Sequence, residues 1–239
     1  MGNILGEPFK KYVDKQIKKR QEIHGKVDRT TEEISYLNST NAWIKLASGV
    51  SLTQERLNLL KNEYGNPLVT TTNPGKELAM KNVLFNGVTS FNEISSEDKL
   101  QQQQRTGFLG PNGAYGMGGY DFGIVPMPGI VSMDSQDLNR GSIKKTRVKL
   151  KAYNKNQFDI LDVLYLRLGY TVLLEFGNNR YWDSGDEIKQ GTNTLTSMGP
   201  TLIDQEFFEV DDDYYNLLLN IEKLRRERRG NYDAILGKV

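Results

Sequence analysis

Residues 127–176 constrain the fold most, because the spacing of their apolar side chains changes twice along the stretch. After residues 127–133, the tetrapeptide Leu138-Asn139-Arg140-Gly141 predicts a tight turn. Residues 142–153 then alternate between apolar and basic side chains, which is typical of a β-strand. A helix over 156–168 and a short apolar strand over 170–176 follow. The stretch therefore predicts strand, turn, strand, helix and strand in a soluble α+β protein.

The second strand of this stretch has two unlike faces. One face is semi-apolar, with Thr146, Val148 and Leu150, and the other carries the basic side chains of Lys145, Arg147, Lys149 and Lys151. Like charges on one strand repel, so the basic face is expected to meet solvent, acidic groups of neighbouring molecules or a pore. In the helix that follows, one stripe is predicted to be buried, comprising Phe158, Leu161, Leu164, Tyr165 and Leu168.

Composition excludes several classes of chemistry. The chain of 239 residues has no cysteine, which rules out thiol catalysis, thiolate zinc sites and disulfides. Its single histidine, His24, excludes a metal site built from several histidines, and we interpret it as a polar residue near a helix end. The net charge of +1 gives no global attraction to nucleic acid or membrane. We expect no metal and no cofactor. We also expect no membrane contact, because no apolar run is long enough to span a bilayer.

Residues 1–106 are predicted to form a mainly helical docking region. Residues 7–24 have the spacing of an amphipathic helix, with a thin apolar stripe that includes Phe9, Tyr12 and Ile17 and several lysines on the other faces. We expect this helix to dock on a protein; a solvated face and a membrane surface are the alternatives. Thr30 and Glu33 form a capping box for a second helix, and residues 42–50 favour a strand over a helix. Helices are also expected over 51–64 and from Asn73 onward.

Residues 107–129 differ in composition, since eight of these 23 residues are glycine. We expect an irregular loop that separates the docking region from the rest of the chain. Its aromatic side chains are candidates for anchoring against another chain, namely Tyr115, Tyr120 and Phe122. The run Gly116–Gly119 is followed by no Walker lysine and does not complete a dinucleotide fingerprint, so it does not indicate a nucleotide site.

Residues 130–239 are predicted to form a β-rich domain with helices at 156–168 and 211–229. The second of these helices is expected to bury Leu217, Leu218, Ile221 and Leu224. For the arginines near its end, Arg225 and Arg228 among them, a solvated helix end is the favoured interpretation, and contact with a phosphate or an acidic partner is the alternative. Residues 231–239 indicate a strand whose pairing partner comes from a neighbouring chain or from a continuation of the protein.

Two runs within the central stretch carry a resemblance to a known family. They are Asn156-Gln157-Phe158-Asp159-Ile160-Leu161-Asp162-Val163-Leu164-Tyr165 and Leu173-Leu174-Glu175-Phe176-Gly177. Together with residues 129–133 they resemble tail-tube and baseplate-hub proteins of tailed bacteriophages and related contractile injection machines. The opening, Leu5-Gly6-Glu7-Pro8-Phe9, also looks like the start of such virion proteins. The resemblance implies an α+β fold: an antiparallel β-barrel or sandwich of tail-tube type with an inserted helix, preceded by a helical N-terminal region.

The resemblance also implies a function. It points to a non-enzymatic structural protein of the virion tail or baseplate, assembled in the host cytoplasm. Such a hub or tail-tube-like adaptor associates with itself into a ring around a channel and contacts other tail or baseplate proteins. DNA would be only a transient cargo of the channel. No catalytic residues carry over, because the matching runs contain none.

Three other functions stay open. A cell-wall hydrolase would need a carboxylate pair drawn from Asp204, Glu206 and Glu209. A carbohydrate-binding tail module would stack sugars on aromatic side chains, with Tyr115, Tyr120, Tyr181 and Trp182 as candidates. Nucleic-acid binding through the basic strand would be strongly salt-dependent.

Overall fold

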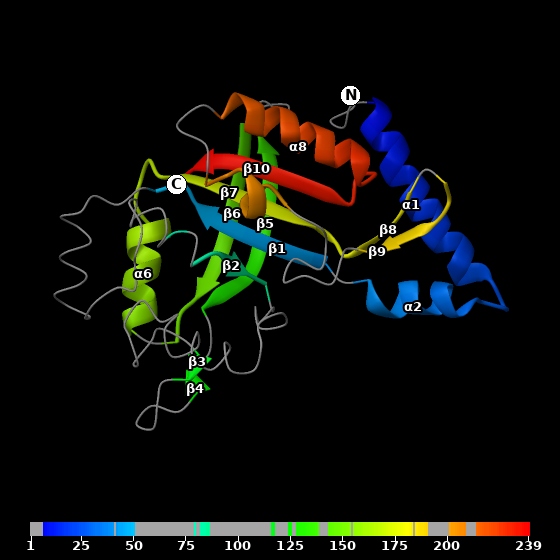
Figure 1. Cartoon of the computed structure of the whole chain (residues 1–239), viewed down its shortest axis with the longest axis horizontal. Helices are drawn as coiled ribbons and strands as arrows, with labels where there is room; N and C mark the ends of the chain where they lie inside the picture. The colour runs from blue at the N-terminus through cyan, green and yellow to red at the C-terminus, as the bar shows by residue number, and fades with distance from the viewer. Residues whose placement is uncertain are drawn as a thin grey trace. The chain divides into compact units, whose positions relative to one another are not determined.

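The structure is a computed structural model of the chain. It describes residues 7–40, 42–50, 79, 82–86, 116–117, 124–125, 128–138, 143–153, 155–183, 185–190, 201–208 and 214–239. These residues form a mixed α/β arrangement with antiparallel sheets (Figure 1). The chain divides into two compact units: residues 1–44, 135–146 and 175–235 belong to the first, and residues 45–134, 147–174 and 236–239 to the second. Several strands contribute residues to both units.

Two helices open the described chain, α1 (Glu7–Gly25) and α2 (Thr31–Ser39). The predicted capping box is confirmed: the Glu33 amide donates to Thr30 Oγ1 at 3.2 Å, and the Thr30 amide donates to Glu33 Oε2 at 2.9 Å. These bonds satisfy two backbone donors that a helix start leaves unpaired. The Glu33 carboxylate also accepts a bond from Lys26, and this bond is the first cause of its lowered pKa.

A four-stranded sheet has the order β10-β7-β1-β2. Its strands are β1 (Ala42–Ser48), β2 (Leu84–Phe85), β7 (Thr171–Asn178) and β10 (Tyr232–Lys238), so the predicted strands over 42–50, 170–176 and 231–239 are confirmed. Asn178 bonds to Asn231 at one end of the β7–β10 pair, and Val239 bonds to Tyr170 at the other, so these strands are antiparallel. The partner of the last strand is therefore β7 of the same chain.

The sheets in the described part of the chain do not close into a barrel. Closure requires the first and last strands of a sheet to pair, whereas β10 and β2 stand at opposite ends of the strand order. Three further pairs are separate two-stranded sheets: β3–β4, β5–β6 and β8–β9. The expectation of a barrel is corrected accordingly, while the inserted helix is confirmed as α6 (Lys155–Tyr165), which lies between β6 and β7 in the chain.

The apolar stripes of two helices differ in part from prediction. In α6, Ile160, Leu161, Leu164 and Tyr165 are buried, but Phe158 is exposed because Gln157 takes the buried position and accepts a bond from the Tyr153 amide. The helix also ends at Tyr165, three residues earlier than predicted, so Leu168 lies beyond it and is exposed. Helix α8 (Tyr215–Glu227) buries Leu217 and Ile221 and exposes Leu218, since adjacent helical residues point about 100° apart.

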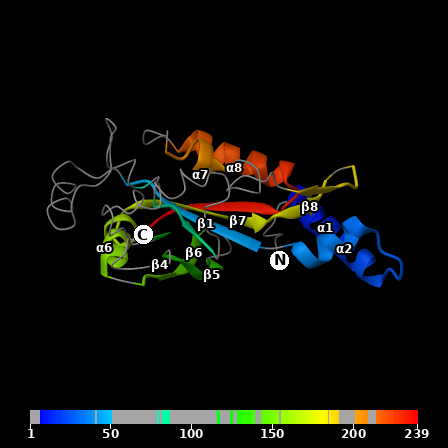
Figure 2. The same ribbon diagram turned by 60° about the horizontal axis from the view of Figure 1, so that its bottom comes forward.

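A buried polar network joins a strand to a short helix in the first unit. Glu175 of β7 is fully buried; its Oε1 accepts the Tyr232 hydroxyl at 2.6 Å and the Leu202 amide at 2.8 Å, and its Oε2 accepts the Ile203 amide at 3.3 Å. The carboxylate thus caps the start of α7 (Leu202–Gln205), which lies with α8 on one face of β7 and β10 (Figure 2). Burial, and secondarily the neighbouring Glu175, raises the pKa of Tyr232, which keeps this hydroxyl a donor.

Part of the predicted organisation lies outside the described residues. The helix expected over 51–64 belongs to this part, as do Tyr115, Tyr120 and Phe122 of the glycine-rich segment. The helix expected from Asn73 through Leu84 is wrong at its end: Ala79 is helical, but Leu84 begins the strand β2. The glycine-rich segment was predicted as an irregular loop, but two short strands are described in it, β3 (Gly116–Met117) and β4 (Ile124–Val125). They pair antiparallel, with Gly116 opposite Val125 and Met117 opposite Ile124.

Candidate interaction surfaces

The central turn and strands form a two-stranded ribbon, β5 (Gly129–Leu138) and β6 (Ile143–Lys151). Only four residues join the strands, a connection too short for parallel pairing. The Ser135 and Thr146 hydroxyls lie 3.0 Å apart, which places both side chains on one face. The predicted alternation is confirmed: Thr146, Val148 and Leu150 are half-buried, whereas the basic side chains are exposed, namely Lys145, Arg147, Lys149 and Lys151.

The ribbon also exposes large aliphatic side chains. Val131 is 58% exposed, Ile143 56% and Leu138 42%. In the part of the chain that the structure describes, neither β5 nor β6 pairs with any third strand. A ribbon of ten- and nine-residue strands with so little cover is marginally stable alone in water. Exposed apolar side chains, and edges that have no strand partner within the described residues, suit contact with another molecule.

A second surface is built where α1 packs on the hairpin β8 (Arg180–Trp182) and β9 (Ile188–Gln190), both in the first unit. The Gln16 side chain binds one backbone position twice: its amide nitrogen donates to the Trp182 carbonyl at 2.5 Å, and its oxygen accepts the Trp182 amide at 2.9 Å. Two lysines form ion pairs with Asp186 at the hairpin turn: Lys15 Nζ lies 2.8 Å from Oδ1, and Lys19 Nζ lies 3.7 Å from Oδ2. The bond from Lys15 is the first cause of the lowered pKa of Asp186.

Replacing Gln16 by alanine is expected to loosen the hairpin from α1. Two hydrogen bonds to a half-buried backbone position are lost, which costs about 1–2 kcal/mol of unfolding free energy. Amide exchange in β8 and β9 should quicken accordingly. Gln21→Ala is the matched control, because it makes the same change at an exposed position of the same helix. Alanine favours a helix slightly more than glutamine does, so Gln21→Ala should leave the stability unchanged or raise it slightly. Equal losses in the two variants would contradict the docking role of Gln16.

Trp182 is part of the core of the first unit. Its ring packs edge-on against Tyr36 with 5.8 Å between ring centroids, and Ile23 completes this buried cluster. The Lys19 ammonium lies 5.6 Å from the centroid of the indole ring. A sugar therefore has no open indole face to stack on, so Trp182 does not serve as the stacking platform that a carbohydrate-binding module would need.

The hairpin turn is stabilised by its own carboxylates. Asp183 Oδ1 accepts the Gly185 amide at 2.8 Å and the Glu187 amide at 3.0 Å. These backbone donors, that of Glu187 first, lower the pKa of Asp183. The Lys189 ammonium lies 2.7 Å from a carboxylate oxygen of Glu187 and 3.4 Å from one of Asp183. The bond to Glu187 is the first cause of the raised pKa of Lys189. Both shifts favour the charged forms of Asp183 and Lys189.

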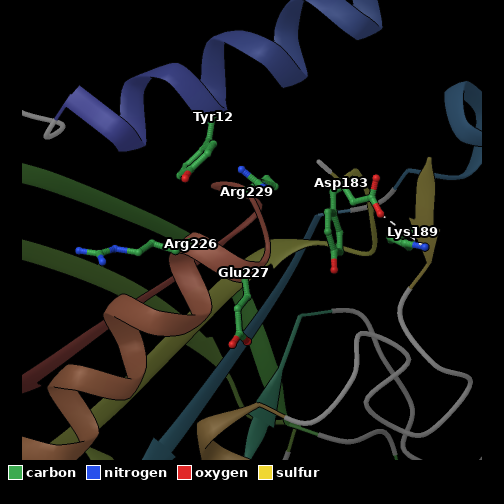
Figure 3. Close-up of a pocket in the computed structure, with 7 residues that line it drawn as sticks. Tyr12, Asp183, Lys189, Arg226, Glu227 and Arg229 are labelled. Atoms are coloured by element: carbon green, nitrogen blue, oxygen red, sulfur yellow. Dashed lines mark ion pairs between the residues drawn. The ribbon is translucent and has the colours of Figure 1, made fainter. Parts of the chain in front are cut away.

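A cleft of about 590 Å³ opens beside this hairpin, with all its lining residues in the first unit (Figure 3). It is lined by Tyr12, Tyr181, Asp183, Lys189, Arg226, Glu227 and Arg229. Arg229 is held against Tyr12, with its guanidinium carbon 4.6 Å from the centroid of the phenol ring. Its backbone is in the left-handed region, at φ 51°, which is uncommon for a residue other than glycine.

Sequence-predicted interaction residues are thus divided among several environments. Tyr12 lines the cleft and Ile17 is exposed on α1, while the side chain of Phe9 is outside the described part. Arg225 donates hydrogen bonds within the fold, to the Asp233 carboxylate and to the Ala234 carbonyl. The guanidinium carbon of Arg228 lies 5.3 Å from the centroid of the Tyr232 ring. These two arginines hold α8 to β10. Glu206 accepts a bond from Asn220, and the side chains of Asp204 and Glu209 are not described.

The cleft itself was not predicted from the sequence. In the sequence, Arg229 is the last residue of the helix predicted over 211–229, and Lys189 lies in a polar stretch with no regular spacing. The pair Arg229-Gly230 directly after the helix is a signal for left-handed backbone, because glycine at this place is typical of a helix end. It would have indicated a turn there, but not that Tyr12 lies opposite.

Comparisons with known proteins add no relative. No model of a protein family matches the chain, and no curated protein or solved structure matches it significantly. Among the helices that the structure describes, none has the length and apolar character needed to cross a membrane.

Proposed function

We propose that this chain is a structural component of a bacteriophage tail, a baseplate hub or tail-tube-like adaptor that assembles through protein–protein contacts around a central channel. The proposal rests on the resemblance of residues 156–165 and 173–177 to such proteins. One structural observation supports it most, namely the β5–β6 ribbon, which exposes aliphatic side chains and pairs with no third strand among the described residues.

The charge of the ribbon favours one mode of self-association. Within β6 every charged residue is basic, so pairing β6 with β6 of another copy would place like charges opposite one another, which is destabilising. β5 carries no basic residue and contains Asp134 and Asp137. Pairing β6 of one copy with β5 of the next avoids the repulsion and is heterologous, and heterologous contacts that close produce rings. The exposed basic face would then meet the neighbour or the channel, where DNA is a transient cargo.

Removing the aliphatic side chains of the ribbon tests the proposal. The triple variant Val131→Thr, Leu138→Thr and Ile143→Thr keeps residues that favour strands and leaves the net charge unchanged. Because these side chains are already exposed in the single chain, its stability should change by less than about 0.5 kcal/mol per site. Self-association should weaken at least about tenfold, because apolar area is no longer buried between copies.

Val27→Thr combined with Leu168→Thr is the control, since both residues are highly exposed outside the ribbon. The dissociation constant of the assembly, measured by sedimentation, should not respond to the control. An assembly equally weakened by both variants, or by neither, would assign self-association to a different surface.

A further inference from the structure

We infer that the cleft between α1, the β8–β9 hairpin and the end of α8 is a binding site for an acidic peptide segment of a partner protein. This inference deepens the proposed function by naming a partner chemistry, but it concerns a surface separate from the ribbon. Variants in the cleft leave the ribbon sequence unchanged, so peptide binding and self-association can fail independently.

The central element of the site is Arg229. Its side chain is half-buried and stacks on Tyr12, and in the part of the chain that the structure describes its guanidinium donates to no acceptor. Contact with the ring does not use the N–H donors of the guanidinium, and two parallel N–H donors can bind one carboxylate. An arginine held in this way is prepared for an anion that the described residues do not supply.

The backbone at Arg229 supports a role beyond folding. A left-handed conformation costs a residue with a side chain roughly 1–2 kcal/mol, and glycine adopts it without that cost. Gly230, the next residue, is also left-handed, at φ 75°. A glycine at 229 would therefore satisfy this turn better than arginine does. Strain that a simple substitution would relieve points to a use for the side chain.

The surroundings favour separated carboxylates over a compact phosphate. Arginine binds phosphate as well as carboxylate, but many phosphate sites also use a helix N-terminus or clustered backbone amides. The helix end beside this cleft is instead the C-terminal end of α8, which carries partial negative charge. The other two cations of the lining come from different elements and are paired within the chain: Lys189 of β9 with Glu187 and Asp183, and Arg226 of α8 with Glu222. Arg229 is therefore the cation that a carboxylate of the partner would bind first. Spaced charges and two tyrosine rings suit an extended chain with carboxylates at intervals.

Fluorescence anisotropy with the full chain tests the inference. The probe is a fluorescein-labelled octapeptide of alternating glutamate and alanine at low salt. A labelled octapeptide of alternating lysine and alanine is the control of opposite charge. The wild type should bind the glutamate peptide and not the lysine peptide. Arg229→Gly should weaken binding about ten- to a hundredfold, as expected when a hydrogen-bonded charge pair is removed. The melting temperature of this variant should be equal to or above that of the wild type.

Lys18→Ala removes one exposed cation of α1 outside the cleft and should change peptide affinity less than about twofold. No binding by the wild type, or equal losses in Arg229→Gly and Lys18→Ala, would overturn the inference. A single-stranded oligonucleotide or inorganic phosphate that binds more tightly than the peptide, with the same dependence on Arg229, would show a nucleic-acid or phosphate site instead.

Discussion

Gly177→Ala is expected to lower the free energy of unfolding by about 2–4 kcal/mol. A Cβ on Gly177 of β7 would lie 2.2 Å from the Asn231 carbonyl oxygen and 3.1 Å from Cζ2 of Trp43. Real Cβ atoms do not approach a backbone oxygen so closely, so the backbone itself has to move. Trp43 and Asn231 are both buried, which leaves little room for that movement. Chemical denaturation monitored by tryptophan fluorescence measures the loss.

Gly237→Ala in the neighbouring strand is the matched control. A Cβ there meets nothing within 4 Å, so the unfolding free energy should stay the same or rise by up to about 1 kcal/mol. The difference between the two variants isolates the close approach from the entropy that any glycine loses on folding. Similar losses in both variants would mean that β7 and β10 tolerate a side chain at Gly177.

Glu175→Ala should cost still more, about 3–5 kcal/mol. The substitution leaves the Tyr232 hydroxyl and the amides of Leu202 and Ile203 without their acceptor in a buried place, and it also opens a cavity. Because the carboxylate caps α7, that helix should show faster amide exchange than α8. The same denaturation experiment gives the free energy, and hydrogen exchange gives the location.

Tyr232→Phe is a milder variant for comparison with Glu175→Ala. It removes one donor from the network and keeps the ring, so a loss of about 1.5–3 kcal/mol is expected, the range for hydrogen bonds to charged groups. If Glu175→Ala were no more destabilising than Tyr232→Phe, the bonds to α7 would contribute nothing and the capping role of Glu175 would be wrong.

Local signals in the sequence predicted the elements well. The Thr30–Glu33 capping box, the alternation in residues 142–153 and the apolar run at 170–176 depend on neighbours in the chain, and all three are confirmed. The ends of helices were predicted less accurately. After Tyr165 the side chains still favour a helix, but α6 ends at this residue and the chain turns. Leu218 shows the same limit, since a stripe of leucines does not reveal how wide the buried face is.

Long-range features were beyond the reach of these signals. In the sequence, Glu175 is a polar residue within an apolar strand, and nothing near it indicates a partner. Its hydrogen-bond partners Tyr232 and Leu202 are distant in the chain and lie beside it only in the folded protein. The cleft has the same origin, because Tyr12 and Arg229 are far apart in the sequence and meet through the packing of the first unit. Barrel closure failed as a prediction for a related reason: strand number and edge pairing are set by the whole sheet, not by any one strand.

The most direct test of the assembly account is the molar mass of the purified chain by light scattering over a range of concentrations, with electron microscopy of the eluted species. The account predicts a defined oligomer that images as a ring with a central channel, and a shift toward the 27.2 kDa chain in the triple threonine variant of the ribbon. A wild-type chain that stays at 27.2 kDa at every concentration, and forms no ring, would contradict self-assembly through the β5–β6 ribbon.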